Sequence, residues 1–228
     1  MFRREAGIFI AFEGGEGSGK STLSKNIFNQ LSKHFGEKVH LFREPGSTKL
    51  GEDIREVLLK KRETPVEPLT ELLLFLSARA QSVSEKIAPA LSQGDIVLVD
   101  RFHASTIAYQ SGGRGLDRKL CEEFCDKSSN GLWPGLTLFL DIDPEKGLLR
   151  SRACSDEDRM ESEEITFHEK IHKTYQDLLF DHPDKYVRLD AQESKELVFA
   201  HAWDMVKALI LQHPRYGSAL ATLRRHKQ

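Results

Sequence analysis

A glycine-rich segment near the N-terminus has the composition of a phosphate-binding site. It reads Gly14-Gly15-Glu16-Gly17-Ser18-Gly19-Lys20-Ser21, which fits the spacing G-x-x-x-x-G-K-[ST], and it lies between a strand-like run and a helix-like run. Glycines allow backbone N–H groups to close around a polyphosphate, and the positive end of the helix dipole adds to the attraction. The segment therefore predicts a site for a nucleoside triphosphate.

The side chains of this loop have distinct predicted roles. The Lys20 ammonium group is expected to bind the β- and γ-phosphates, and the Ser21 hydroxyl group to bind Mg²⁺, the cofactor that accompanies ATP. We predict that ATP is bound by Gly14, Gly15, Glu16, Gly17, Ser18, Gly19, Lys20, Ser21 and Thr22.

Two arginines follow apolar runs that are typical of strands. Arg101 comes directly after Asp100, whose carboxylate is suited to hold Mg²⁺ or its bound water. Arg43 opens the run Arg43-Glu44-Pro45-Gly46, in which proline and glycine favour a fixed turn. Guanidinium groups bind phosphate in a bidentate manner, so the two arginines favour an acceptor that already carries a phosphate group. The alternative is that each arginine is a solvated residue at a strand end.

Phe75 and Arg79 lie four residues apart in a helix-like run, so they share one face of that helix. Together they offer a flat apolar ring and a planar donor, which suits a nucleobase. Because arginine has only donors, it would accept a base with a carbonyl oxygen at its edge and reject one with an amino group. The alternative is that Phe75 is an ordinary core residue.

The elements that must position these residues alternate along the chain. Strand-like runs are short and apolar throughout, which is typical of parallel strands covered on both faces. They lie at 8–13, 39–42, 96–100, 136–142 and 186–189, and helix-like runs lie at 20–35, 50–61, 69–91, 117–129, 144–152, 165–180 and 194–212. This order predicts an α/β fold with a doubly wound parallel sheet, helices on both faces and ligands beyond the carboxyl ends of the strands.

The domain organisation is predicted to be simple. Residues 1–212 form one domain, since no internal repeat or linker divides them. Residues 153–163 begin with a polar stretch between two helix-like runs and are expected to form a lid over the site. Residues 213–228 follow the end of a helix-like run, are rich in arginine and are expected to form a basic, solvated C-terminal tail.

Composition excludes several classes of protein. The chain has 228 residues and a net charge of −2, whereas a dedicated nucleic-acid binder usually carries a basic surplus. No apolar run approaches the ~20 residues that cross a bilayer, and no signal peptide is expected. The three cysteines form no C-x-x-C pair, which disfavours structural zinc and favours free thiols in a reducing compartment. We therefore predict a cytoplasmic protein with no membrane or nucleic-acid partner.

The ordered set of motifs resembles the thymidylate kinase family. The resemblance covers about residues 6–210 and rests on the glycine-rich loop, the run 43–46, Phe75 with Arg79, Asp100-Arg101-Phe102, Leu140-Asp141 and the run 105–115, which reads Ser-Thr-x-x-Tyr-Gln-x-Gly-Gly-Arg-Gly. It implies a P-loop NTPase fold with a five-stranded parallel sheet and a lid. It also implies transfer of the γ-phosphate of ATP to dTMP, giving dTDP for dTTP synthesis, by a homodimer.

The resemblance also implies roles for individual residues. Phe75 would stack on thymine, Arg79 would bind its O4 atom, and Tyr109 would crowd the 2′ position of the sugar. Arg43 and Arg101 would hold the 5′-phosphate. The implied dTMP contacts are Glu13, Arg43, Arg55, Phe75, Arg79, Arg101, Ser105, Thr106, Tyr109 and Gln110.

The catalytic arginine is expected in the lid. The glycine-rich loop lacks the arginine that some family members carry, because Gly17 follows Glu16, and this resembles the bacterial variant in which the lid supplies it. The candidates are Arg150, Arg152 and Arg159. Arg159 matches the family's lid end and is the first choice, and Arg152 is the second, although either can instead pair with nearby acidic residues. The predicted catalytic set is Lys20, Arg101, Arg152 and Arg159, and the predicted metal ligands are Ser21 and Asp100.

Two other functions stay open on the sequence alone. One is a kinase for another (deoxy)nucleoside monophosphate such as dUMP. The other is a P-loop switch or nucleic-acid-associated NTPase that hydrolyses ATP without an acceptor, which the acidic net charge disfavours. An assay of ADP release with different acceptors separates all three.

Overall fold

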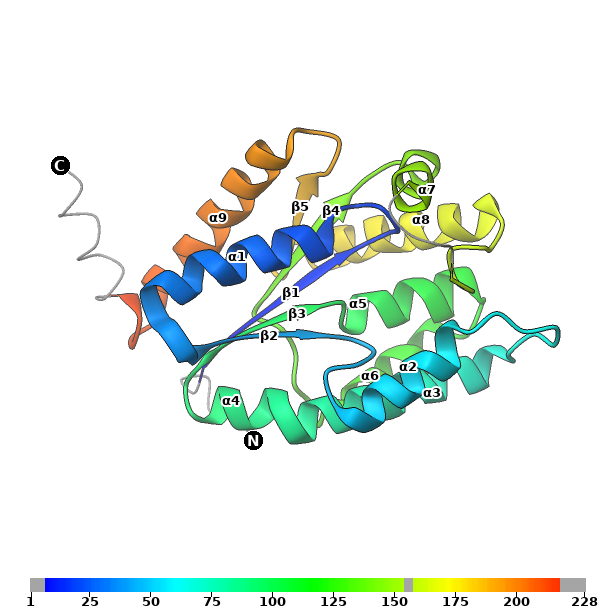
Figure 1. Cartoon of the computed structure of the whole chain (residues 1–228), viewed down its shortest axis with the longest axis horizontal. Coiled ribbons are helices and arrows are strands. Elements are labelled where there is room, and N and C mark those ends of the chain that lie inside the picture. The colour runs from blue at the N-terminus through cyan, green and yellow to red at the C-terminus, as the bar shows by residue number, and fades with distance from the viewer. Residues whose placement is uncertain (1–6, 154–157, 218–228) are drawn as a thin grey trace.

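The fold is built on a five-stranded sheet in which all paired strands are parallel. The structure, a computed structural model, describes residues 7–153 and 158–217 (Figure 1). The strands are β1 (Ile8–Gly14), β2 (Val39–Arg43), β3 (Ile96–Asp100), β4 (Leu136–Asp141) and β5 (Tyr186–Asp190), in the spatial order β2-β3-β1-β4-β5. The predicted α/β class, parallel sheet and flanking helices are therefore confirmed.

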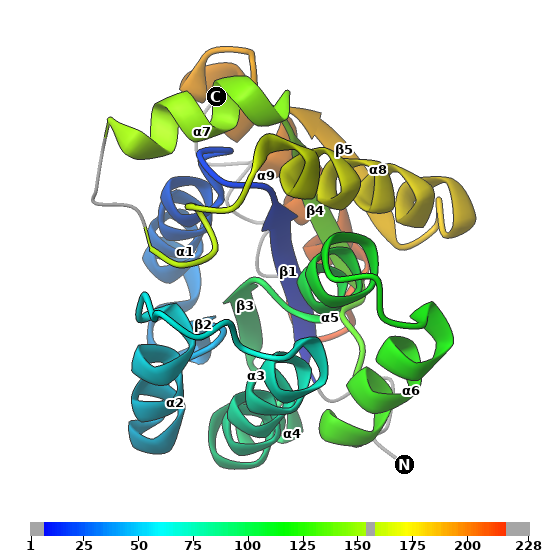
Figure 2. The ribbon, with the colours of Figure 1, turned by 90° about the vertical axis from the view of Figure 1, so that its right-hand side faces the viewer.

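Helices cover both faces of the sheet, as Figure 2 shows. One face packs against α1 (Lys20–Phe35) and α9 (Lys195–Gln212), and the other packs against α4 (Ala88–Ser92), α5 (His103–Thr106) and α8 (Ile165–Asp181). The remaining α-helices are α2 (Lys49–Leu59), α3 (Pro68–Ser82), α6 (Arg118–Ser128) and α7 (Pro144–Arg152), and the shorter helices are η1 (Gly36–Lys38), η2 (Val83–Ile87) and η3 (Ile107–Gly113).

The burial pattern explains why these elements form. All seven residues of β1 are buried, as a central strand covered on both faces requires. In α1 the buried apolar residues Leu23, Ile27 and Leu31 recur every four positions, so they form one stripe against the sheet. On α8 the residues Phe167, Ile171 and Tyr175 do the same on the opposite face. Apolar periodicity therefore sets the layers.

The register of the strands gathers the chemistry-bearing residues at one end of the sheet. Asp100 at the end of β3 lies opposite Phe12 of β1 and Arg43 of β2. The residues that follow these positions, among them Glu13 and Arg101, leave the sheet together at its carboxyl end. This is where a doubly wound sheet binds its ligands.

Two helical regions differ from the prediction. The helix predicted at 69–91 is a continuous succession of α3, η2 and α4 that extends to Ser92. The sequence predicts no helix or strand at 103–113, yet this segment forms α5 and η3. Its glycines obscure the helical pattern, but they are needed for packing: a Cβ on Gly113 would lie 2.5 Å from the Phe167 ring, and one on Gly112 would lie 2.1 Å from Thr174 Oγ1.

The start of the predicted tail packs on the domain. Tyr216 is 3% exposed, its ring contacts Phe35 edge to face at 5.0 Å, and its hydroxyl donates to Gly94 O at 2.6 Å. The solvated tail therefore stays a prediction for 218–228 only, which lie outside the described residues, as do lid residues 154–157. Among the helices that the structure describes, none is long and apolar enough to cross a membrane.

Candidate nucleotide site

Two hollows meet at the glycine-rich loop, beyond the carboxyl ends of β1 and β3. The main pocket encloses about 180 Å³ and is lined by charged, polar and aromatic side chains, among them Arg101 and Phe75. A second cavity runs along the loop and the start of α1. Glu16, Lys20 and Ser21 line both hollows. A ligand in one would therefore meet a ligand in the other at these side chains.

The loop owes its shape to glycine backbones. Gly17 and Gly19 have φ angles of 62° and 86°, which side-chain-bearing residues rarely adopt. A Cβ on Gly17 would also lie 1.9 Å from Gly147 O, so α7 packs directly on the loop. Of the nine predicted ATP contacts, seven line the cavity along the loop: Glu16, Gly17, Ser18, Gly19, Lys20, Ser21 and Thr22.

Lys20 stands in the first turn of α1 and is nearly buried. Its Nζ donates to Gly15 O at 3.0 Å and lies 3.9 Å from Glu16 Oε2. Burial and the neighbouring Arg101 guanidinium lower the pKa of Lys20, and the Glu16 carboxylate opposes this shift. The ammonium group is thus held at the junction of the two hollows, as its predicted role requires.

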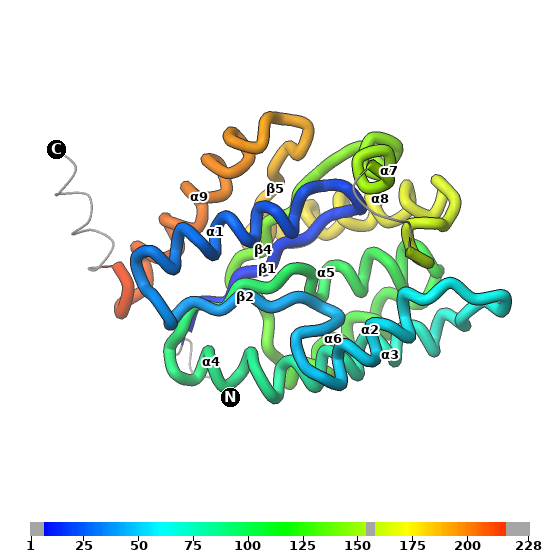
Figure 3. The backbone as a smooth tube through the Cα atoms, in the orientation of Figure 1, coloured from blue at the N-terminus to red at the C-terminus, as the bar shows by residue number. Residues whose placement is uncertain are grey.

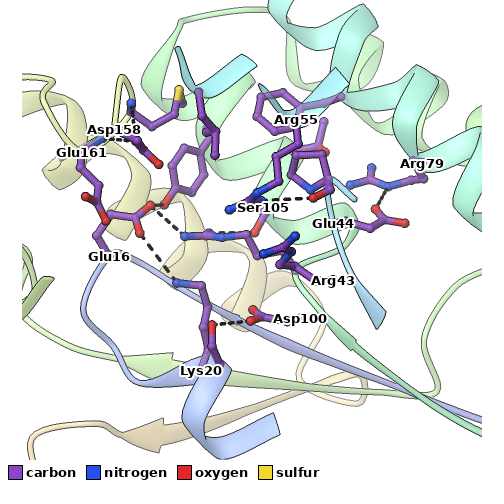
Figure 4. Close-up of a pocket in the computed structure, with 18 of the residues that line it drawn as sticks. Glu16, Lys20, Arg43, Glu44, Arg55, Arg79, Asp100, Ser105, Asp158 and Glu161 are labelled. Atoms are coloured by element: carbon purple, nitrogen blue, oxygen red, sulfur yellow. Dashed lines mark hydrogen bonds and ion pairs between the residues drawn. The ribbon is translucent and has the colours of Figure 1, made fainter. Parts of the chain in front are cut away.

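Ser21 and Asp100 offer a site for a hard cation. The Ser21 hydroxyl donates to Asp100 Oδ2, which joins the loop to the end of β3. Figure 4 shows Asp100 near Lys20, the residue before Ser21. Asp100 Oδ1 is buried and has no hydrogen-bond partner among the described residues. A buried carboxylate oxygen left in this state beside a serine hydroxyl fits Mg²⁺, which binds through one or two carboxylates together with substrate phosphates.

Arg101 is fixed beside the loop by several contacts. Its backbone adopts a φ of 69°, and its N–H donates to Phe12 O at 2.9 Å. Its Nη2 lies 2.8 Å from Glu16 Oε1, its Nη1 donates to Gly14 O at 3.1 Å, and the guanidinium carbon lies 5.0 Å from the centre of the Tyr109 ring. The guanidinium group is therefore poised between the loop and the main pocket.

The Glu16 carboxylate balances the positive charges of Lys20 and Arg101. Its Oε1 also accepts from the Tyr109 hydroxyl at 2.6 Å. Burial alone would raise the pKa of Glu16, but Arg101, Lys20 and the Tyr109 hydroxyl lower it to about 2. Glu16 is therefore ionised at neutral pH.

The other predicted phosphate-side arginines line the main pocket at its rim. Arg43 is half-exposed, and its Nη2 lies 2.9 Å from Glu52 Oε2. Arg55 donates from Nη1 to Pro45 O at 3.1 Å. Both arginines are thus held near the pocket by contacts that a phosphate group could replace.

The base-side residues predicted from the sequence come together in the main pocket. Phe75, Arg79, Thr106 and Gln110 all line it. Arg79 is almost fully buried: its Nε donates to Glu44 Oε2 at 2.6 Å and its Nη2 donates to Phe102 O at 3.0 Å. This buried pairing fixes the plane of the guanidinium group.

Glu13 does not line the main pocket. It is fully buried, and its oxygens accept from Phe102 N at 2.7 Å, Ser105 Oγ at 2.5 Å and the Tyr175 hydroxyl at 3.2 Å. Direct contact between Glu13 and dTMP stays a prediction. In the structure Glu13 positions Ser105, which does line the pocket together with Tyr109.

The lid arginines lie in different places. Arg159 turns away from the loop: its Nε donates to Leu58 O at 2.7 Å and its Nη1 lies 2.6 Å from Glu71 Oε2. Arg152 is exposed at the end of α7. Neither arginine lines the main pocket or the cavity along the loop. The catalytic role of each stays a prediction.

Arg150, the third candidate for the catalytic arginine, lines the cavity along the loop and donates from Nη1 to Ala191 O at 2.8 Å. Other site residues were missed by sequence reasoning. Met160 and Glu161 close the main pocket from the lid side. Glu71, on α3, contacts the lid through Arg159. The only signal for Glu71 was its position one helical turn before Phe75, which does not distinguish it from a solvated glutamate.

Comparison with known proteins identifies relatives of this architecture. The family model described as thymidylate kinase matches residues 12–202. A thymidylate kinase of Protochlamydia amoebophila is 46% identical over 88% of this chain and 92% of its own, and one of Lacticaseibacillus casei is 41% identical over 88% and 95%. The crystal structure of thymidylate kinase from Ehrlichia chaffeensis has a TM-score of 0.72 at 30% identity and covers 88% of this chain and 99% of its own.

Proposed function

The chain belongs to the thymidylate kinase family, and on that premise we propose that it transfers the γ-phosphoryl group of ATP to dTMP, giving dTDP for dTTP synthesis. The single observation that supports this most is the meeting of the two hollows at Glu16, Lys20 and Ser21. One hollow offers a phosphate-binding loop, and the other offers arginines and an aromatic ring. A kinase for another monophosphate such as dUMP is not favoured.

The proposed reaction needs no general base. The second pKa of a phosphate monoester is ~6, so the attacking oxygen of dTMP is already ionised at neutral pH. The enzyme must bring two polyanions together in line and exclude water. Lys20 would stabilise the charge that moves during transfer, while Arg101 would exchange its Glu16 contact for the 5′-phosphate.

We propose that Ser21 and Asp100 hold Mg²⁺ when ATP is bound. The unpartnered Asp100 Oδ1 supports this assignment. The ion would neutralise the β- and γ-phosphate oxygens and keep them in place. The contact between Ser21 and Asp100 already holds both groups at the junction of the two hollows.

We propose that an arginine of α7 completes the catalytic set. The helix packs against the loop at Gly17, so its last turn, with Arg150 and Arg152, would lie near phosphates bound by the loop. Of the two predicted lid arginines we therefore favour Arg152 as the catalytic one, because Arg159 is committed to α2 and Glu71.

We also propose a homodimer that forms through α2 and α3. Figure 3 shows these two helices side by side, away from α1 and α9. Large apolar side chains are exposed on them, namely Leu50, Val57, Leu69 and Leu73. Sedimentation at micromolar concentration should give a dimer for the wild type and a monomer for Leu73→Glu. A Leu73→Glu variant that stays dimeric would place the interface elsewhere.

We assign the enzyme to the cytoplasm and to small-molecule partners alone, with no nucleic acid or membrane partner. The support for this proposal is that Cys121 and Cys125 are buried free thiols, which suits a reducing compartment, and that the net charge is −2.

The proposed activity is tested by ADP release from ATP with Mg²⁺ and a panel of acceptors: dTMP, dUMP, dCMP, thymidine or none. We expect dTMP to give the highest kcat/KM, and thymidine to fail because it lacks the phosphate that the arginines bind. ADP release that is independent of the acceptor would contradict a kinase and favour an ATPase switch.

A further inference from the structure

Glu71 is a fully buried carboxylate that the proposed mechanism does not use. It lies on α3, four residues before Phe75 and eight before Arg79, so the three share one face of the helix. Phe75 and Arg79 line the main pocket, but Glu71 lies behind it. The Glu71 carboxylate can therefore affect the pocket only through the residues that it contacts.

Both oxygens of Glu71 accept hydrogen bonds from neighbouring elements. Oε1 accepts from Gln110 Nε2 at 3.0 Å and from Arg114 Nε at 3.0 Å. Oε2 accepts from Arg114 Nη2 at 3.1 Å and pairs with Arg159 Nη1 at 2.6 Å. Glu71 thus joins the pocket residue Gln110 on η3 to the lid residue Arg159.

The charge of Glu71 decides which end of the Gln110 amide faces it. Burial would raise the pKa of Glu71, but its hydrogen bonds and its two arginine partners lower that pKa, so the group is ionised at neutral pH. An ionised carboxylate can only accept hydrogen bonds, so Gln110 must turn its NH₂ group toward Glu71. Its carboxamide oxygen is thereby left for the pocket that Gln110 lines.

An acceptor at this position selects between pyrimidines. Thymine and uracil carry an N3–H donor beside the O4 acceptor, whereas cytosine carries an unprotonated N3 beside an amino group. Arg79 supplies only donors, which suit O4, and the Gln110 oxygen accepts from N3–H. The two residues together present a donor and an acceptor in the order that thymine requires.

We propose that Glu71 is the positioning residue that sets base specificity in this enzyme, by holding the Gln110 carboxamide with its oxygen toward the base. The inference rests on the proposed function, because it assumes that the main pocket binds the pyrimidine of a nucleoside monophosphate. Glu71 touches no substrate and acts only through Gln110.

The test is Glu71→Gln, which keeps the size of the side chain and removes its charge. The new side chain has one acceptor oxygen and an NH₂ donor in place of two acceptor oxygens, so it no longer forces Gln110 to keep its own oxygen toward the pocket. Dissociation constants of dTMP, dUMP and dCMP are measured by calorimetry. We expect the preference for dTMP over dCMP to fall about tenfold, the equivalent of one hydrogen bond. The preference for dTMP over dUMP stays unchanged, since both present the same edge.

A second pair of variants separates base reading from folding. Glu71→Gln leaves Arg159 buried without its counter-charge, which can unfold the protein. Arg159→Gln is therefore compared with the double variant Glu71→Gln/Arg159→Gln, in which that charge is gone. We expect Arg159→Gln to keep the dTMP preference over dCMP and the double variant to lose about tenfold. Glu67→Gln, at an exposed position one turn earlier, is the matched control and should equal the wild type.

The outcomes distinguish this inference from the proposed function. If the wild type binds and phosphorylates dTMP, and the folded double variant keeps the selectivity of Arg159→Gln, the role of Glu71 is wrong and the kinase assignment stands. If the wild type neither binds nor phosphorylates dTMP, the proposed function itself fails.

Discussion

The two halves of the site are built in opposite ways. The phosphate loop, which forms the core of the triphosphate half, is one continuous stretch of chain, residues 14–22, shaped by glycine backbones and a helix start. The acceptor half is assembled from separate elements whose charged side chains hold one another, as Arg79 does with Glu44 and Arg101 with Glu16. The first half depends on local geometry and the second on long-range pairs. The two should therefore respond differently to substitution.

The largest effect is expected in the continuous half. Lys20→Met removes the charge at the junction of the two hollows, so we expect kcat to fall about a thousandfold while the fold is retained. Rapid-quench single-turnover measurements check this. Lys25→Met, at an exposed position on the same helix, should have normal activity. A tenfold loss or less for Lys20→Met would show that the loop does not depend on this ammonium group.

Arg152 and Arg159 flank the middle of the segment that the sequence predicts as a lid, and substituting them tests whether this segment takes part in catalysis. We expect Arg152→Ala to lower the single-turnover rate about a hundredfold, as the loss of a transition-state contact does. Arg159→Ala should slow the chemical step less, because Arg159 contacts Leu58 and Glu71 rather than the loop. The reverse ranking would return the catalytic role to Arg159, and no loss in either would remove the lid from catalysis.

In the acceptor half, we expect the more buried arginine to contribute more to dTMP affinity. Arg101→Ala is expected to weaken dTMP binding about thirtyfold, within the range for hydrogen bonds to a charged group. Arg43→Ala should weaken it only a few-fold, because the Arg43 side chain is 49% exposed and solvent screens its charge. Calorimetry with dTMP measures both. Unchanged affinity in Arg101→Ala would undo the assignment of the phosphate subsite.

The smallest effect concerns stability at low pH. The pKa of Glu16 is about 2 in the fold against 4.5 as the ordinary value, so Glu16 stabilises the native state above pH 4.5. That contribution is lost as the pH falls from about 4.5 toward 2. We expect the Tm of the wild type to fall more steeply across this window than that of Glu16→Gln. Glu37→Gln, an exposed control, should follow the wild type.

The contrast between the halves also explains how far the sequence could be interpreted. Local patterns predicted the sheet and the phosphate loop, because glycine spacing and apolar periodicity are properties of neighbouring residues. Phe75 and Arg79 both line the main pocket, as expected for two residues that share one helix face. The role of Glu71 could not be predicted, because it depends on Gln110 and Arg159, which are distant in the chain.

The helical state of 103–113 was missed for a related reason. Gly112 and Gly113 disfavour a helix by their local propensity. They are required here because a Cβ at either position would clash with a residue of α8. The direction of the Arg159 side chain depends in the same way on a buried partner elsewhere in the fold. Tertiary contacts therefore determine both the helix at 103–113 and the direction of the Arg159 side chain. Such contacts cannot be predicted from a single sequence.

The packing of Tyr216 against the domain has a consequence for folding during synthesis on the ribosome. Its ring closes the layer between α1 and the sheet, and its hydroxyl caps the turn that precedes β3. Yet Tyr216 is synthesised after every strand and helix given above. During synthesis the apolar side chains around Phe35 therefore stay partly exposed to solvent until Tyr216 has left the ribosome. A nascent chain halted before it should be a better client for chaperones than one halted just after.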